Sequence, residues 1–234
     1  MLPKLVLPHY DIKVPSTGKT IKIRPFTVRE EKILLLALES GDPNDIINAT
    51  LQTVQACIVT KKVNVDTMPF FDVDYLFIAM RAKSVGESID INYTCPTAGC
   101  GHTFKTDIDI TNCEVINYNN NNLIDLGNIK IQMKYPNYAT MKKLDESVNP
   151  MIKKIDFIAA CIDYIAEGEK IISTKDVTRE ELIEYIEGMT QAQYKKLEQF
   201  VDYLPSFVVT KDIKCPKCGN DNHLEYTEFE SFFV

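Results

Sequence analysis

The sequence predicts an α+β fold that is mainly helical and contains a small antiparallel sheet module. Apolar residues recur at helical spacing over residues 27–86 and 137–203, whereas residues 87–136 and 204–234 contain runs that alternate between apolar and polar. Residues 1–26 indicate an extended arm with a hairpin. Because each sheet segment carries a close pair of cysteines, we expect the two to form one module, discontinuous in sequence, within a single compact domain.

The composition is that of an ordinary globular protein. Of the 234 residues, 45% are hydrophobic and 25% charged, and the net charge is -7. The acidic balance and the scattered lysines and arginines argue against a broad nucleic-acid-binding surface. No stretch approaches the roughly 20 apolar residues that span a bilayer, and the first residues lack the layout of a signal peptide. We therefore expect a reducing cytoplasm, where the seven cysteines serve as metal ligands or core residues.

The arm contains the predicted hairpin. Residues 12–14 and 20–23 favour strands, and residues 15–19 supply the Pro, Ser and Gly that are typical of a turn. The Gly-Lys-Thr that begins at Gly18 is not a phosphate-binding loop. Such a loop also needs a glycine five positions earlier, where Lys13 stands.

Three helices are predicted after the arm. Thr27 and Glu30 form a capping box, in which each side chain satisfies a free N–H of the helix start, and this helix ends near Gly41. Asp42-Pro43 opens the second helix, with proline at the first helical position. The third, at about residues 69–83, is apolar on nearly all sides and is expected to be buried.

The rest of the chain is predicted to alternate between sheet and helix. Strands are expected around residues 89–93, 104–110, 129–133, 207–209 and 224–226, with a loop at the asparagine run 117–122. A further helix is expected because one helical face would hold Met151, Ile155, Ile158, Ile162 and Ile165. Two more capping boxes are predicted, Thr178 with Glu181 and Thr190 with Gln193.

Two cysteine pairs carry the clearest chemical signal. Four residues separate Cys95 from Cys100 and two separate Cys215 from Cys218, and each pair has Pro after its first Cys and Gly after its second. Tetrahedral zinc takes four thiolates at about 2.3 Å, and a tight turn presents two sulfurs together. We therefore predict one structural Zn²⁺ in a split four-Cys zinc ribbon. The alternative is four free cysteines that lie beside turns by chance.

The remaining cysteines and the histidines fit no catalytic pattern. His102 and His223 follow the two pairs, but four sulfurs already complete a zinc shell. Cys57, Cys113 and Cys161 stand alone and are expected to fill the core. A four-Cys shell lacks the open position of a catalytic zinc. The chain is therefore predicted not to be an enzyme.

Several strings in the first 90 or so residues are specific in combination. They are Leu2-Pro3-Lys4-Leu5 with Pro8 and Tyr10; Pro15-Ser16-Thr17-Gly18-Lys19; Arg24-Pro25-Phe26-Thr27-Val28-Arg29-Glu30-Glu31-Lys32 with Leu34-Leu35; and Phe71-Asp72-Val73-Asp74-Tyr75-Leu76-Phe77 with Arg81 and residues 83–87. Through these strings the chain resembles the baseplate hub assembly proteins of T-even-like contractile phages. Further on, only the general order of sheet, Cys pair, helices and second Cys pair matches.

This resemblance implies a role in building the central hub of the baseplate, as a chaperone or as a retained subunit. The partners would be other phage baseplate and hub proteins, with no membrane, nucleic acid or small-molecule substrate. The protein would occur in the virion tail baseplate, or in the host cytoplasm during assembly. The cysteines alone leave an alternative, a zinc-ribbon nucleic-acid-binding protein. Lys214 and Lys217 favour that alternative, whereas Asp212, Asp221 and Glu225 oppose it.

Two segments are predicted to bind partners. The first contains Arg24, Phe26 and Arg29, whose arginines are expected to pair with nearby carboxylates (Glu30, Glu31 or Asp72) as a modest surface effect. The second is the C-terminal tail, where aromatic side chains would anchor the chain in a hub protein; its predicted contacts are Phe229, Phe232, Phe233 and Val234. The alternative is that the tail folds back onto the chain's own sheet.

Overall fold

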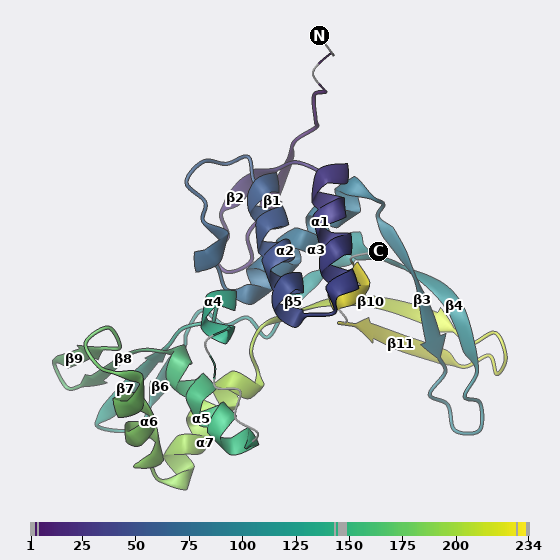
Figure 1. The fold of residues 1–234 in the computed structure, drawn as a ribbon. Helices are drawn as coiled ribbons and strands as arrows, with labels where there is room; N and C mark the ends of the chain where they lie inside the picture. Colours follow the sequence, from purple (N-terminus) through teal and green to yellow (C-terminus); the bar gives the residue numbers. More distant parts are fainter. Residues whose placement is uncertain (1–2, 4, 143, 145–148, 228, 233–234) are drawn as a thin grey trace. The chain divides into compact units, whose positions relative to one another are not determined.

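The structure, a computed structural model, describes residues 3, 5–142, 144, 149–227 and 229–232 (Figure 1). The chain divides into two compact units: unit 1 comprises Met1–Ile116 and Ser206–Val234, and unit 2 comprises Asn117–Pro205. Both units combine helices with antiparallel strands, so the fold is α+β.

Unit 1 begins with the predicted hairpin. β1 (Tyr10–Lys13) pairs antiparallel with β2 (Thr20–Ile23). Gly18 lies in the turn at a φ of 66°, which residues with a side chain rarely adopt. The N–H of Val14 donates to the carbonyl of Lys19, and the N–H of Gly18 donates to the carbonyl of Val14. The hairpin prediction is confirmed.

Three helices follow the hairpin, as predicted. α1 (Val28–Ser40) starts at the Thr27 cap and ends at Gly41, which has a left-handed φ of 67°. α2 (Pro43–Cys57) starts after Asp42, whose side chain accepts a hydrogen bond from a backbone N–H in the first turn. η1 (Val65–Thr67) precedes α3 (Phe70–Ser84). α3 lies at the centre of unit 1, because its apolar residues on all sides are buried: Phe71, Val73, Leu76, Phe77, Ile78 and Met80.

Two small sheets complete unit 1. β3 (Ser88–Thr94) and β4 (Thr103–Asp109) form a hairpin, after which η2 (Ile110–Asn112) leads to β5 (Glu114–Ile116). The chain then leaves for unit 2 and returns as β10 (Ser206–Lys214), which pairs with β5 on one side and with β11 (Asp221–Tyr226) on the other. Strands β5 and β10, which are far apart in the sequence, are therefore neighbours in one sheet.

The described residues of unit 2 form a four-stranded antiparallel sheet and four helices. The strand order is β6 (Leu123–Asp125), β7 (Ile129–Met133), β8 (Ile162–Glu167) and β9 (Lys170–Ser173). The helices are α4 (Tyr138–Met141), α5 (Pro150–Cys161), α6 (Arg179–Glu187) and α7 (Gln191–Asp202). The capping boxes predicted for α6 and α7 are present. The core is formed by Ile131, Met133, Ile158, Ala159, Cys161, Ile162, Leu182, Ile186 and Leu197.

The expectation of a mainly helical fold is wrong, and so is the long helical face through Ile162 and Ile165. α5 ends at Cys161, and Ile162 opens β8. Isoleucine spacing fits either a helix or a strand over so short a run, and β-branched side chains favour a sheet. Both edges of β8 are paired, because Ile165 lies opposite Ile131 of β7 and Ile172 of β9. The described residues form eleven strands beside seven α-helices, and none of these helices is long and apolar enough to cross a membrane.

The described part of the C-terminal tail packs on unit 1 itself. η3 (Phe229–Phe232) brings the ring of Phe229 to 5.3 Å from Phe77 and 5.9 Å from Phe207, measured between ring centroids. Phe232 is fully buried, 5.6 Å from Phe207 and 5.8 Å from Tyr226. These contacts correspond to the alternative in which the tail folds onto its own sheet. Phe233 and Val234 lie outside the described residues.

We predict that Phe232→Ala destabilises unit 1 by about 3–5 kcal/mol, because removing a buried phenylalanine leaves a cavity. Thermal unfolding followed by circular dichroism should show a midpoint several degrees lower. Tyr203→Ala is the control, since Tyr203 is 69% exposed and its removal should leave the midpoint nearly unchanged. An unaltered midpoint for Phe232→Ala would contradict the packing of the tail.

Candidate metal centre and the start of the first helix

The structure brings together the four predicted cysteines. Cys95 and Cys100 lie in the turn of the β3–β4 hairpin, and Cys215 and Cys218 lie in the turn of the β10–β11 hairpin. All four sulfurs lie within 4.8 Å of one another. The Sγ atoms of Cys95 and Cys218 are 3.8 Å apart, as are those of Cys100 and Cys215. A tetrahedral ion with Zn–S bonds of about 2.3 Å requires sulfur–sulfur distances near 3.8 Å.

The backbone explains the glycine positions of the two turns. Gly99, Gly101 and Gly219 have φ values of 79°, 54° and 74°, so each occupies the left-handed region that favours glycine. Each turn is closed at its base, where the N–H of Cys95 donates to the carbonyl of His102 and the N–H of Cys215 donates to the carbonyl of Asn220, both at 2.9 Å. The sulfurs therefore need little further ordering to bind an ion.

Hydrogen bonds stabilise the thiolate form of two of the four sulfurs. Hydrogen bonds with the side chain and backbone of Thr97 lower the pKa of Cys95 to about 6, and hydrogen bonds with the backbone of the second turn lower the pKa of Cys215. The pKa of Cys100 is instead raised to about 11: a backbone hydrogen bond at His102 lowers it, but burial and the neighbouring thiols outweigh that bond. Thr97 Oγ1 also accepts a hydrogen bond of 3.0 Å from Asn220 Nδ2, which links the first turn to the second. Sequence reasoning overlooked Thr97 and Asn220, although each lies within two residues of a cysteine or its glycine. Four clustered sulfurs could hold a metal ion, and such a donor set fits a closed structural site.

The two histidines beside the turns lie outside the four-sulfur cluster. The His102 ring stacks on Phe104, with centroids 5.9 Å apart. The exposed His223 has Nδ1 2.7 Å from Asp212 Oδ1, and this contact raises the pKa of His223. The order His223-Leu224-Glu225 has the H-x-E spacing found in zinc deaminases, but His223 pairs with Asp212 and is not part of the sulfur cluster.

The other three cysteines fill the cores of the two units, as expected. Cys57 and Cys113 are buried in unit 1, and Cys161 is buried in unit 2. Burial raises the pKa of Cys57 to about 11 and the pKa values of Cys113 and Cys161 to about 12. Such thiols remain protonated and behave as small apolar side chains.

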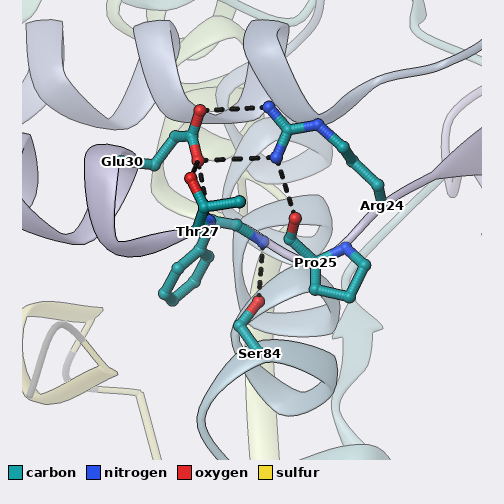
Figure 2. A network of polar contacts seen from close by, with 6 residues as sticks. Arg24, Pro25, Thr27, Glu30 and Ser84 are labelled. Atoms are coloured by element: carbon teal, nitrogen blue, oxygen red, sulfur yellow. Dashed lines mark hydrogen bonds and ion pairs between the residues drawn. The ribbon is translucent and has the colours of Figure 1, made fainter. Parts of the chain in front are cut away.

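The predicted partner segment forms a polar network at the start of α1 (Figure 2). Arg24 Nη2 donates to Glu30 Oε1 at 3.0 Å, and Arg24 Nη1 donates to the carbonyl of Pro25 at 2.9 Å. The N–H and hydroxyl of Thr27 both donate to Glu30 Oε2, at 2.7 and 2.6 Å. In addition, Ser84 Oγ accepts from the N–H of Phe26 at 2.9 Å. The network therefore links β2, α1 and α3.

The expected pairing of Arg24 with Glu30 is present, but it is not a modest surface effect. Glu30 is only 6% exposed, so its charge is stabilised by the hydrogen bonds around it rather than by water. Burial opposes ionisation of Glu30, yet the hydrogen bonds from Arg24 and Thr27 outweigh it and lower the pKa to about 2. Ser84, which sequence reasoning overlooked, lies 58 residues from Phe26 and gave no local signal.

Of the three predicted partner residues in this segment, two make contacts inside unit 1. Arg24 is held by Glu30, and the ring of Phe26 stacks on Phe77 with centroids 6.5 Å apart. Arg29 is exposed on the first turn of α1. Asp72, a further expected partner for an arginine, instead accepts hydrogen bonds from the N–H and hydroxyl of Ser16. Only Arg29 therefore presents its side chain outward.

We predict that Glu30 makes unit 1 sensitive to acid. Because the pKa of Glu30 is about 2 in the folded state and near 4.5 when unfolded, its contribution is present above pH 4.5 and is lost as the pH falls toward 2. Glu30→Gln should lower the unfolding free energy at pH 7 by on the order of 2–3 kcal/mol and reduce its decline between pH 5 and 3. Urea titrations measure both effects. The exposed Glu31→Gln is the matched control, and identical pH slopes for the two variants would contradict the prediction.

Comparison with known proteins identifies the family. The chain matches the family described as T4 bacteriophage base plate protein over residues 7–234. Neither a search of curated proteins nor a search of solved structures finds a match. The family match includes both units, the polar network at Arg24 and Glu30, and all four clustered cysteines. The chain therefore belongs to the T4 bacteriophage base plate protein family.

Proposed function

We propose that this base plate protein is a non-enzymatic component of baseplate hub assembly, acting as a chaperone or as a retained subunit, and that one structural zinc stabilises it. Membership of the family supports a role in the phage tail, with other tail proteins as partners and the virion tail as its location. The hub assignment itself comes from the resemblance of residues 1–90 to hub assembly proteins.

The four-sulfur cluster supports the zinc. All four sulfurs lie within 4.8 Å of one another, and two of the six sulfur–sulfur distances, 3.8 Å each, match the edge of a zinc–thiolate tetrahedron, although the two turns are more than a hundred residues apart in sequence. Thiolate sulfur selects zinc over magnesium or calcium, which prefer oxygen ligands. In zinc-finger peptides such a site contributes on the order of 10 kcal/mol, comparable to the stability of a whole domain.

The same cluster favours a structural rather than a catalytic role. Four protein ligands fill the tetrahedral shell, so no position is left for water or substrate. The nearest histidines lie outside the cluster and contact Phe104 and Asp212. A metal held this way would cross-link the β3–β4 hairpin to the β10–β11 hairpin inside unit 1.

The partner surface that we propose is centred on the exposed Arg29. Val28, beside it, is 78% exposed, and Leu36, two turns further along α1, is 55% exposed. A hub protein that binds here would meet apolar side chains next to a cation. Arg24 and Phe26 would act indirectly in this binding, since they fix the start of α1 from within unit 1. Phe229 and Phe232 would have to leave the core before they could bind a partner.

We predict that the freshly purified protein contains one zinc per chain and that Cys218→Ser loses it. The sheet module of unit 1 should then unfold, with a loss on the order of 10 kcal/mol, whereas the core of unit 2 should persist. Elemental analysis measures the metal, and amide hydrogen exchange separates the two units. Cys113→Ala is the control, because it removes a thiol outside the cluster. Absence of zinc, or full stability in strong chelator, would refute the site.

We further predict that Arg29→Glu impairs tail assembly without altering the fold. Its unfolding free energy should stay within about 0.5 kcal/mol of the wild type, because Arg29 is an exposed side chain. In a phage that depends on the variant for growth, the yield of complete tails should fall several-fold. Lys105→Glu, an equal charge change on the exposed side of β4, should not lower the yield of complete tails.

Mass spectrometry of virions and tail intermediates shows where the chain occurs, and absence of the chain from every hub intermediate would overturn the hub assignment.

A further inference from the structure

The two cysteine turns differ in the length of chain between their sulfurs. Two residues separate Cys215 from Cys218, whereas four separate Cys95 from Cys100. Within the longer loop, the N–H of Cys100 donates to the carbonyl of Thr97 at 2.9 Å. A longer loop has more conformational freedom to lose when both of its sulfurs must point at one ion. The first turn therefore gains more than the second from a further constraint on its sulfurs.

The hydroxyl of Thr97 supplies such a constraint at Cys95. Thr97 Oγ1 lies 3.3 Å from Cys95 Sγ, and while Cys95 carries its proton the thiol donates to this oxygen. A thiolate has no proton to donate, so the hydroxyl then turns and donates to the sulfur instead. Hydrogen bonds to an ionised acceptor are stronger than hydrogen bonds between neutral groups. The contact therefore strengthens when Cys95 becomes a metal ligand.

Asn220 of the second turn extends this contact into a chain of hydrogen bonds. Asn220 Nδ2 donates to Thr97 Oγ1 at 3.0 Å, and a hydroxyl oxygen can accept one hydrogen bond while it donates its own proton to another group. The backbone of Asn220 is itself fixed, because its carbonyl accepts from the N–H of Cys215 at 2.9 Å and from Asn222 Nδ2 at 3.0 Å. The second turn thus positions the hydroxyl that contacts Cys95 in the first turn.

A second amide lies near the same sulfur but cannot play this part. Asn222 Oδ1 is 3.9 Å from Cys95 Sγ, while its Nδ2 donates to the carbonyl of Asn220. An amide oxygen is an acceptor, so it cannot donate to a thiolate. Among the described residues, Thr97 is therefore the one whose side chain both hydrogen-bonds Cys95 and can donate to its charged form.

We propose that Thr97 and Asn220 are positioning residues for the metal: Asn220 orients the hydroxyl of Thr97, and Thr97 orients Cys95 Sγ toward the other three sulfurs. This inference rests on the zinc proposed above and adds two residues that do not bind the ion themselves. Residues that hydrogen-bond a metal ligand typically contribute about 10- to 100-fold to metal affinity. Because Asn220 is exposed and Thr97 only half-buried, we expect the lower end of this range.

Competition for zinc between the full-length protein and a chromophoric chelator measures this contribution. Thr97→Val replaces the hydroxyl by a methyl group of similar size and should weaken zinc binding about 10-fold. Thr97→Ser keeps the hydroxyl and should bind zinc as tightly as the wild type. Thr103→Val is the matched control, because it removes a hydroxyl from the same hairpin that pairs with Thr94, at 2.9 Å, rather than with a sulfur.

Cobalt substitution tests the contact with the sulfur directly. In the Co²⁺-loaded protein, the sulfur-to-metal charge-transfer band reports how strongly the thiolates donate electrons. Loss of a hydrogen bond makes Cys95 a stronger donor, so the band of Thr97→Val should move to longer wavelength. The bands of Thr97→Ser and Thr103→Val should match that of the wild type. A purely structural role of Thr97 in the turn would lower the affinity without this shift.

A double-mutant cycle tests whether Asn220 acts through Thr97. Asn220→Ala keeps the backbone carbonyl that accepts from Cys215 and Asn222, and it should weaken zinc binding several-fold. If Asn220 acts through the hydroxyl, adding Asn220→Ala to Thr97→Val should cause no further loss of affinity. Additive losses would contradict the proposed chain of hydrogen bonds.

The results distinguish this inference from the proposed function. A wild type that binds neither zinc nor cobalt would overturn both. Tight zinc binding by the wild type, with the same affinity and the same cobalt spectrum for Thr97→Val, would overturn the positioning role and leave the zinc site intact. An equal loss of affinity in Thr97→Ser and Thr97→Val would also overturn it, because the hydroxyl would then not be the group that matters.

Discussion

The fold of unit 1 depends on the contact between two turns, the turn of the β3–β4 hairpin and the turn of the β10–β11 hairpin. Cys95 and Cys218 are 123 positions apart in the sequence, yet their sulfurs lie 3.8 Å from each other. Bringing two such distant points together through a flexible loop costs entropy that grows with the logarithm of loop length. The sheet offsets part of this cost, because β10 pairs with β5 as well as with β11. The thiols then meet at the ends of strands that are already aligned.

The same pairing explains how unit 2 fits into the sequence. Ile116 is the last residue of unit 1 before the chain leaves, and Ser206 is the first after it returns. These two residues are paired partners in the β5–β10 ladder. Unit 2 is thus inserted between two residues that are paired in one sheet of unit 1. The insertion therefore needs no distortion of that sheet. Domain insertions are tolerated at sites where the two ends of the insert lie close together.

Local signals in the sequence predicted much of this structure, whereas pairing between distant segments had to be observed. The Thr27–Glu30 cap, the turn at Gly18 and the two cysteine turns each depend on residues a few positions apart, so they could be found from spacing alone. Strand β8 was mistaken for helix because its isoleucines suit both periods, and only their pairing with β7 and β9 decides. Likewise, the bond from Phe26 to Ser84 depends on the packing of α3 against the segment before α1.

The packing around α3 determines which substitutions can reveal a binding surface. Phe77 of α3 contacts Phe26 from the N-terminal segment and Phe229 from the tail, with centroids 6.5 and 5.3 Å away. Loss of Phe77 therefore removes packing from both segments, and a failure of tail assembly would follow from instability alone. Substitution of an exposed side chain avoids this ambiguity, because it changes stability little. Arg29 on α1 is an exposed side chain, so an assembly defect at this position, with stability unchanged, reports a contact with another molecule.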